Sequence, residues 1–560
     1  MIHDLAQTQL AELPGYDLCV IGSGPAGATI AAELANSGLR VCVLESGRAA
    51  VTPLGDRLRR VESEGLRIKS WSRERVLGGA STTWAGLSSP LEEIDLAPRA
   101  WVPLSGWPIA RAQLDRYYAQ AAARYRFPEA AAFGVEGFGA LRAKGERQPE
   151  WNGIEEKVFL AATPPQDFGK EQRAVFEREG TDLYLDASVV RLEAERSNGR
   201  VARAHVRTSG GRTLVLEARA FVLATGGIEN ARLLLVSRDT CEAGLGNEHD
   251  QVGRYLMNHP KSYHGVLTLE RSVTELPFFF GCMWRGFAGY AGLRLCDAEQ
   301  ERAGLLDSYC RFEPLFPWSD SIGVESLVTL AKRSRLVASR LRHKAQKEVV
   351  ALRDYSETGD DSELQNERRG PAGWMSLGWN VVRDMPRVSR YAWNRVFERA
   401  RPAVHAVRLR NFMEMQPHPE NRVQLSTRQD EFGVPVPLVR HQCTELDRRS
   451  LVALHEKLAT ELPRAGFGRL ESQLGSVQPW PIDQDASHHM GTTRMGTDPA
   501  NSVVDPDGRV HSLENLYIAG ASVFPTSGSA NPTYTIVALS IRLAEHLRGE
   551  LGSAQGAPRA

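Results

Sequence analysis

The chain is poor in cysteine, and the cysteines that it has are scattered. Its 560 residues include seven cysteines, and none of them stands in a Cys-x-x-Cys pair. A structural zinc site needs closely spaced ligands, and a disulfide framework needs a denser set of cysteines. We therefore expect neither a metal site nor a disulfide framework.

An excess of charge of one sign is also absent. Lysine and arginine together number 68, aspartate and glutamate together number 68, and the formal net charge at pH 7 is zero. Proteins that bind nucleic acids usually carry a basic excess, so we expect no nucleic-acid partner. A small or weakly charged substrate fits this balance better.

Long apolar runs are missing as well. No stretch of eighteen apolar residues occurs, so we expect no transmembrane span. Residues 1–14 lack the basic start and apolar run of a signal peptide, and we infer a cytoplasmic protein. With 42% hydrophobic and 24% charged residues, the chain has a globular composition, and its length predicts two domains.

The N-terminal region has the pattern strand, glycine turn, helix, strand. An apolar run at 16–21 (YDLCVI) precedes the turn at 22–27 (GSGPAG), and residues 28–36 have the composition of a helix. Residues 39–44 (LRVCVL) predict a second buried strand, which Glu45 closes. This order is typical of a unit that binds a dinucleotide.

Each residue of the turn has a physical task in such a unit. Gly22 permits the tight turn, Gly24 lets the backbone approach a pyrophosphate, and Gly27 lets helix and strand pack closely. The N-terminus of the helix, where Pro25 and Ala26 lie, offers partial positive charge to the phosphates.

Glu45 is placed to accept hydrogen bonds from ribose hydroxyls. An ordinary glycine turn without a ligand is the alternative, and it leaves the position of Glu45 unexplained. An acid after the second strand disfavours NADP, because it would repel the 2′-phosphate. The turn alone leaves NAD and FAD both open.

Four further segments, together with this turn, resemble the glucose–methanol–choline (GMC) family of FAD oxidoreductases. They are residues 76–84 (VLGGASTTW), 221–230 (FVLATGGIEN), 488–496 (HHMGTTRMG) and 515–535 (NLYIAGASVFPTSGSANPTYT). The segments keep the family's order over nearly the whole chain, and the C-terminal ones are the more specific. Within the family, the chain looks most similar to the branch of pyranose 2-oxidase, bacterial sugar oxidases and fructose dehydrogenase.

The resemblance implies FAD as the cofactor, with a glycine loop against the flavin. Gly79 lies in a loop that can pass close to a flat ring, and the hydroxyls of Ser81, Thr82 and Thr83 can hydrogen-bond its polar edge. In several family members a histidine at the place of Thr83 holds FAD covalently. Threonine cannot do this, so we expect non-covalent FAD. A surface loop without a ligand is the alternative.

The resemblance also implies two catalytic residues. The family's base falls on His488, three residues before the glycine of a Gly-Thr pair, and its partner falls on Asn531. A histidine, with an unperturbed pKa of about 6.5, can take the hydroxyl proton of an alcohol near neutral pH. The amide of Asn531 can hydrogen-bond the oxygen as charge develops. A helix N-cap is the alternative role of Asn531, and the two roles are compatible.

Small residues and a helix are predicted around Asn531. Gly520 and Ala521 follow a short strand and let a cofactor approach, and residues 534–547 have the composition of a helix. Pro532 and Thr533 precede this helix, and proline suits a first turn. The N-terminus of the helix is expected to point at the N1–O2 edge of the flavin.

Two neighbours of these motifs stay open between a functional and a structural role. His489 either lines the site or packs away from it. Arg494 either binds cofactor or substrate, or forms a structural salt bridge.

Other strands are predicted outside the motifs. Residues 219–225 and 516–518 read as buried strands, and residues 228–235 read as a helix. Residues 422–425 and 434–436 predict two antiparallel strands joined by a turn, in a region where the family has its substrate-binding sheet.

The middle of the chain has no sharp motif. The run 331–404 is rich in basic residues and tryptophan, and a solvated helix face is its default interpretation, with a lid, a subunit contact or a membrane-surface contact as alternatives. Several aromatic residues either line a pocket or belong to the core, and we favour the core: Phe278, Phe279, Phe280, Trp284, Tyr309 and Trp318.

We thus expect an α/β fold in which a Rossmann-like FAD-binding domain and an α+β substrate domain with an antiparallel sheet are interleaved in sequence. The expected boundaries are 12–95, 201–264 and 481–551 for the FAD-binding domain, 96–200 and 265–480 for the substrate domain, and 552–560 for a flexible tail.

The expected reaction is FAD-dependent oxidation of an alcohol CH–OH group to a carbonyl. His488 would take the proton and flavin N5 the hydride. The resemblance points to a sugar, a glycoside or another secondary alcohol, with O2 or another carrier as electron acceptor, and it leaves a homo-oligomer open. Three alternatives are a lyase with structural FAD, a flavin subunit that acts through a partner, and an NADH-linked enzyme.

Overall fold

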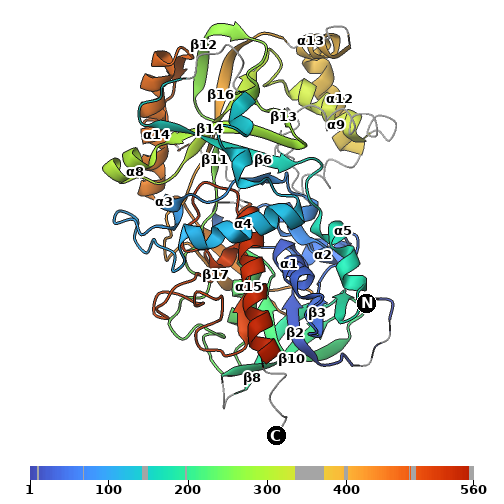
Figure 1. Ribbon diagram of the computed structural model, residues 1–560. Helices are drawn as coiled ribbons and strands as arrows, with labels where there is room; N and C mark the ends of the chain where they lie inside the picture. Colours follow the sequence, from blue (N-terminus) through green and yellow to red (C-terminus); the bar gives the residue numbers. More distant parts are fainter. Residues whose placement is uncertain are drawn as a thin grey trace.

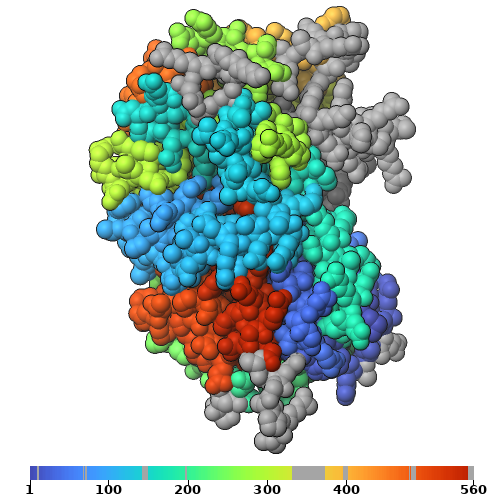
Figure 2. Space-filling model, in the orientation of Figure 1, coloured from blue at the N-terminus to red at the C-terminus, as the bar shows by residue number. Residues whose placement is uncertain are grey.

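The computed structural model describes residues 1–8, 10, 12–66, 68–141, 149–195, 199–333, 371–396, 402–478, 480 and 487–553. They form two parts, each built on a large β-sheet and placed one above the other in Figure 1. Segments from the beginning, the middle and the end of the chain meet in the lower part. Figure 2 shows the blue N-terminal and red C-terminal segments side by side there. The expected interleaving of an α/β part with a second part is confirmed.

The sheet of the lower part has a parallel core. Its strands run in the order β1-β7-β3-β2-β10-β9-β8, and β20 also pairs with β10. Ile21 lies beside Leu44 and Leu223, so the carboxyl ends of β2, β3 and β10 meet at one edge. The strands are β1 (Ile2–Asp4), β2 (Tyr16–Ile21), β3 (Val41–Leu44), β7 (Thr181–Leu185), β8 (Ser188–Glu195), β9 (Arg200–Arg207), β10 (Thr213–Leu223) and β20 (Leu516–Ile518).

Helices surround this sheet, and α15 packs against both α1 and α4. Helix α1 begins at Pro25, three residues before the expected Ala28, because the fixed φ and missing N–H of proline suit a first turn. Its Ile30 and Leu34 are fully buried. The helices are α1 (Pro25–Leu34), α2 (Pro53–Leu58), α3 (Glu93–Leu96), α4 (Arg111–Tyr125), α5 (Phe168–Glu171), α6 (Gly227–Val236) and α15 (Thr533–Ser553).

The sheet of the upper part is antiparallel, as expected. Its order is β19-β12-β16-β15-β14-β6-β5, with β11 on β16 and β13 on β14. Helix α14 (Glu445–Arg464) packs on β6, β14 and β19 through Leu451, Leu454 and Leu458, which recur at helical spacing. The strands are β5 (Leu87–Ser88), β6 (Ile154–Ala162), β11 (Lys261–Ser262), β12 (Val266–Val273), β13 (Cys282–Trp284), β14 (Phe287–Leu295), β15 (Tyr309–Leu315), β16 (Val404–Phe412) and β19 (Gly468–Glu471).

The predicted hairpin forms, but in a different sheet. Strands β17 (Arg422–Gln429) and β18 (Pro435–His441) pair antiparallel, and β18 also pairs in parallel with β4 (Glu62–Gly65). These three strands make a separate sheet against α6, and they do not join the antiparallel sheet of the upper part. Alternation of polar and apolar residues predicts a strand but not its partner, which explains the difference.

The expected boundary at residue 200 does not follow the sheets. Strands β7 and β8, inside the range 96–200, belong to the sheet of the lower part, where β7 pairs in parallel with β3. Without this pairing, β3 would be an open edge with unpaired backbone groups, so β7 completes the sheet at β3.

A small helical group lies beside the upper sheet (Figure 1). It contains α9 (Ile322–Arg333), α12 (Pro371–Arg383) and α13 (Met385–Val396), with a core of Trp318, Val324 and Val388. Two shorter helices in the upper part are α7 (Pro277–Phe280) and α8 (Asp297–Ala303). Residues 334–370 and 397–401 of the predicted basic run lie outside the described residues, and so does most of the predicted tail, 554–560.

Candidate active site

The three glycines of the nucleotide turn lie in three different environments. Gly22 has a φ of +104°, and a side-chain carbon there would come within 2.6 Å of the carbonyl oxygen of Ala224. A side-chain carbon at Gly27 would lie 1.9 Å from the carbonyl oxygen of Gly22, so α1 packs on the turn with no room to spare. At Gly24, no atom of the described chain lies within 4 Å of that position. The backbone at Gly24 is therefore open to a ligand.

Glu45 is buried at the end of β3, beside the glycine turn. The N–H and hydroxyl of Ser23 donate to its Oε2 at 3.0 and 2.6 Å, and the N–H of Gly47 donates to its Oε1 at 2.7 Å. The hydroxyl of Ser46 also donates to Oε1, at 3.4 Å, and this is the longest of the four contacts. Glu45 both braces the turn and faces the cavity next to it.

A cavity with a volume of about 320 Å³ lies between the two parts and opens next to the turn. Nearly all predicted site residues line it: Gly22, Gly24, Pro25, Ala26, Glu45, Gly79, Ser81, Thr83, His488, Gly520, Ala521, Asn531, Pro532 and Thr533. Two do not line it. Gly27 packs inside the turn, and Thr82 is exposed, with its hydroxyl donating to the carbonyl of Gly79 at 2.9 Å.

The glycine–serine loop is a short 3₁₀-helix, η2 (Gly79–Thr82). Ser81 is buried, donates to the carbonyl of Gly78 at 2.6 Å and accepts from the N–H of Phe168 at 3.1 Å. The hydroxyl of Thr83 donates to the carbonyl of Ala80 at 3.2 Å. These bonds hold the loop in shape against the cavity, and the hydroxyl of Ser81 keeps a lone pair for a ligand.

His488 is held against a segment that precedes β11. Its backbone N–H donates to Oδ1 of Asn258 at 2.7 Å, and its Nδ1 lies 3.0 Å from Nδ1 of His259. The two imidazole rings are nearly perpendicular, with centroids 5.1 Å apart. A short antiparallel bridge between Met257 and Met490 lays the two segments side by side.

His259 has a second contact on its other ring nitrogen. Its Nε2 lies 2.9 Å from the carbonyl oxygen of Gly528, and the side chain is buried. Burial lowers the pKa of His259 to about 4, so the ring is neutral near pH 7. Sequence reasoning did not single out His259, because only the bridge at Met257 brings it to the motif, and such a bridge leaves no pattern in the sequence.

Asn531 stands directly before α15. The carbonyl of Pro532 accepts from the N–H of Ile536 at 2.8 Å, so Pro532, and not Asn531, occupies the N-cap position. The amide of Asn531 has no hydrogen bond to the described residues, while the side chain lines the same cavity as His488. A proton acceptor and a neutral amide thus converge on one space.

The two neighbours left open by the sequence differ in role. His489 lines the cavity, burial lowers its pKa to about 3, and its Nε2 has no partner among the described residues. Arg494 does not line the cavity. Its guanidinium donates to the carbonyl of Leu104 at 2.5 Å, and its central carbon lies 4.9 Å from the centroid of the Tyr255 ring. The role of Arg494 is therefore structural, although it forms no salt bridge with the described residues.

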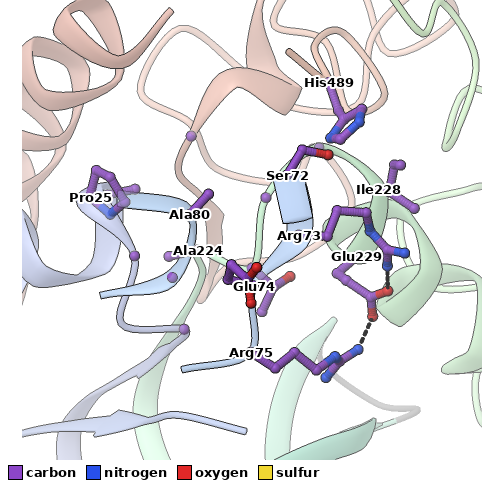
Figure 3. Close-up of a pocket in the computed structure, with 18 of the residues that line it drawn as sticks. Pro25, Ser72, Arg73, Glu74, Arg75, Ala80, Ala224, Ile228, Glu229 and His489 are labelled. Carbon is purple, nitrogen blue, oxygen red and sulfur yellow. Dashed lines mark hydrogen bonds and ion pairs between the residues drawn. The ribbon is translucent and has the colours of Figure 1, made fainter. Parts of the chain in front are cut away.

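A group of charged residues on the cavity wall was not predicted. Glu229, at the start of α6, pairs with Arg73, with Arg75 at 2.9 Å and with Arg232 at 3.3 Å. These three arginines lower the pKa of Glu229 to about 2 against its burial. Figure 3 shows Glu229, Arg73 and His489 on one side of the pocket, with Pro25 and Ala80 on the other. The repeated arginines at 73 and 75 were the available signal.

Two aromatic side chains bring the upper sheet into the site. Tyr309 of β15 and Phe412 of β16 stack with centroids 4.6 Å apart, and both line the cavity with Lys261. Tyr309 is therefore both core, as expected, and a wall of the cavity. Phe278 and Phe279 belong to the core of the upper part, Phe280 and Trp284 pack against it, and Trp318 belongs to the core of the small helical group.

The described part of the chain contains neither a cluster of metal-ligating side chains nor a helix that could span a membrane. No three histidine, cysteine, aspartate or glutamate side chains there are grouped as a metal site requires. Among the described helices, none combines the length and the apolar character needed to cross a bilayer.

Known proteins similar to this chain include FAD-dependent oxidoreductases. The family model described as GMC oxidoreductase matches residues 417–540, and the one described as FAD dependent oxidoreductase matches residues 17–240. Paromamine 6'-oxidase of Streptomyces fradiae is 25% identical over 96% of this chain and 92% of its own length. The fructose dehydrogenase large subunit of Gluconobacter japonicus is 25% identical over 67% of this chain and 55% of its own. The crystal structure of pyridoxine 4-oxidase from Mesorbium loti superposes with a TM-score of 0.53 at 16% identity, covering 95% of this chain and 98% of that one.

Proposed function

The chain belongs to the GMC oxidoreductase family and uses FAD, and on that premise we propose that it oxidises the CH–OH group of a sugar, a glycoside or another secondary alcohol to a carbonyl. The observation that carries the proposal is that His488 and Asn531 line one cavity with the nucleotide turn.

The residues of the turn fit FAD. The backbone at Gly24 is open, the N-terminus of α1 adjoins it, and Glu45 lines the cavity at the end of β3. When bound, FAD supplies the acceptor for the hydride that leaves the alcohol carbon. Because Thr83 stands where some relatives have a histidine, we propose that the flavin is held without a covalent bond. Acid denaturation followed by filtration tests this, and flavin that stays with the protein would contradict it.

His488 and Asn531 divide the chemistry at the substrate oxygen. The imidazole of His488 takes the hydroxyl proton, which leaves the lone pair on oxygen to form the carbonyl as the hydride departs. The amide of Asn531 donates to that oxygen, and its position before a helix keeps it oriented. Neither residue needs to move far, since both already line the cavity.

The substrate class is proposed from the relatives and from the upper wall of the cavity. Two of the similar proteins carry the name of a substrate that they oxidise: paromamine 6'-oxidase and the fructose dehydrogenase large subunit. In this chain, the stacked rings of Tyr309 and Phe412 offer an apolar surface to the face of a sugar ring.

The test is anaerobic reduction of the bound flavin by a panel of sugars and alcohols. We expect one class to bleach the visible flavin band of the wild-type protein. His488→Asn should slow this bleaching by about 10²–10⁴-fold, because a general base contributes that much. His264→Asn is the control, since His264 is bonded to the N–H of Gln473 outside the cavity.

The outcomes separate the alternatives. Recovery of the band on admitting air would identify O2 as an acceptor, and a band that stays bleached would identify another carrier. A flavin band that no alcohol bleaches would contradict the proposal and favour a lyase with structural FAD or a flavin subunit that acts through a partner. An unchanged rate in His488→Asn would remove His488 as the base.

We also propose that the protein is cytoplasmic. Cell fractionation tests this point. Recovery of the protein outside the cytoplasm would contradict it.

A further inference from the structure

His488, the base proposed above, is the last member of a short series of hydrogen-bonded groups. The series runs from the carbonyl of Gly528 to Nε2 of His259 at 2.9 Å, and from Nδ1 of His259 to Nδ1 of His488 at 3.0 Å. Its two ends differ, since the first is a buried backbone carbonyl and the last is a side chain that lines the cavity.

The positions of the protons follow from the partners. A carbonyl oxygen can only accept, so the contact with Gly528 requires a proton on Nε2 of His259. His259 is neutral because burial lowers its pKa to about 4, so its Nδ1 carries a lone pair. The contact at 3.0 Å then requires a proton on Nδ1 of His488. Nε2 of His488 is left with its lone pair, which is the form that a base needs.

The same arrangement remains valid after proton transfer. A proton taken up at Nε2 makes the ring of His488 cationic, and its Nδ1–H continues to donate to His259 without a change of partner. A hydrogen bond from a cationic donor is stronger than one from a neutral donor, so the contact favours the protonated state of His488. No side chain has to turn during the step.

The carbonyl of Gly528 is itself fixed in place. Gly528 has a φ of +54°, and a side-chain carbon there would lie 2.6 Å from the carboxyl carbon of Asp95. The next residue, Ser529, donates its hydroxyl to Oδ2 of Asp307 at 2.6 Å. Both carboxyl groups are fully buried. The charged groups that act on His259 are Glu414, Lys157 and Asp307, all buried in the same region.

We propose that His259 is a positioning residue, which holds His488 as the Nδ1–H tautomer and so presents Nε2 as the proton acceptor toward the substrate. The proposal rests on the role of His488 given above. His259 does not line the cavity, so its effect reaches the substrate only through His488.

The first test replaces His259 in the FAD-loaded protein. His259→Leu should slow flavin reduction by about 10–100-fold, the range found for groups that orient a metal-bound imidazole, and should leave KM and FAD content nearly unchanged. His259→Asn should recover most of the rate, since its amide oxygen can accept near the place of Nδ1. The double variant with His488→Asn should be no slower than His488→Asn alone.

A matched control separates positioning from packing. His455 is buried and bonded by both ring nitrogens, to Ser472 and Asn411, and it does not line the cavity. His455→Leu should leave the rate and its pH profile unchanged, whereas His259→Leu should displace the basic limb of that profile. Equal losses in the two Leu variants, with no change in the pH profile, would overturn the proposal.

The decisive readout does not depend on turnover. In protein labelled with ¹⁵N at histidine, the long-range proton–nitrogen spectrum tells the protonated ring nitrogen from the bare one, and His488→Asn assigns the signals. We expect Nδ1–H for His488 in the wild-type protein and loss of this preference in His259→Leu. An Nε2–H tautomer in the wild type would overturn the proposal even if His488 is the base. Conversely, an Nδ1–H tautomer without any alcohol oxidation would keep the positioning role and reject the function.

Discussion

Single atoms decide what the glycines of the nucleotide turn do, and this leads to a paired prediction. Gly27→Ala should destabilise the protein by about 1–3 kcal/mol or prevent folding, because its methyl group would meet the carbonyl of Gly22 at 1.9 Å. Gly24→Ala should fold normally but bind FAD at least about tenfold more weakly, since the methyl group would stand in open space that the cofactor needs. Urea unfolding of the apoproteins and flavin titration measure the two effects. Wild-type FAD affinity in folded Gly24→Ala would show that the turn does not hold a dinucleotide.

At the same scale, residues that belong to a recognisable motif were predicted from the sequence, whereas a residue that acts through a contact with a distant segment was missed. His488 and Asn531 were found because the segments that contain them resemble motifs of the family, and the structure places both on one cavity. His259 was missed, although it touches His488, because the bridge that unites them depends on how the two parts of the fold meet. Proton positions follow from such contacts and cannot be read from residue types.

At the scale of elements, the first turn of α6 gathers an ion cluster on the cavity wall. Glu229→Gln should destabilise the protein by about 3–5 kcal/mol at pH 7, because it leaves Arg73, Arg75 and Arg232 close together without their shared carboxylate. The pKa of Glu229 is lowered from 4.5 to about 2, so its contribution is complete above pH 4.5 and is lost as the pH falls toward 2. The difference between variant and wild type should therefore shrink over that range.

Urea unfolding midpoints at several pH values measure this effect of Glu229. Glu64→Gln is the matched control, because Glu64 also pairs with an arginine, Arg440, but is 58% exposed. Its replacement should change stability by less than about 0.5 kcal/mol. A similar small effect of Glu229→Gln would mean that the cluster does not depend on its carboxylate.

Elements were predicted better than their partners. The strands at 16–21 and 39–44 and the helix after the turn are close to β2, β3 and α1, since local composition and the glycine turn determine them. The hairpin at 422–441 was predicted as a pair of strands but assigned to the wrong sheet. Strand β4 (Glu62–Gly65), which completes its sheet, is short and mostly polar, so no alternation marked it.

At the scale of the molecule, the two parts are joined behind the active site by buried charges. Asp95 of α3 and Lys157 of β6 lie 3.9 Å apart, and Lys157 also lies 3.5 Å from Asp307. Asp307 binds Arg294 at 2.7 Å as well, so its pKa is lowered to about 2. Asp95 is left with the more distant cation only, and its burial dominates.

The buried carboxyl group of Asp95 makes the stability of the protein depend on pH. Burial raises the pKa of Asp95 from 3.8 to about 7, so between these values the folded protein holds a proton that the unfolded chain has released. Stability should therefore fall as the pH rises from about 4 to 7, the opposite of the sign expected for Glu229. Asp95→Asn stays neutral at every pH. The slope of the free energy of unfolding against pH should therefore become less negative, by about the contribution of one bound proton. Asp447, whose burial also raises its pKa to about 7, accounts for a slope that remains.

Unfolding midpoints of the wild type, Asp95→Asn and the exposed control Asp498→Asn between pH 4.5 and 7 decide the matter. If Asp95→Asn keeps the full wild-type slope, Asp95 is ionised in the folded protein, and the junction between the two parts is held by two carboxylates sharing Lys157 rather than by one.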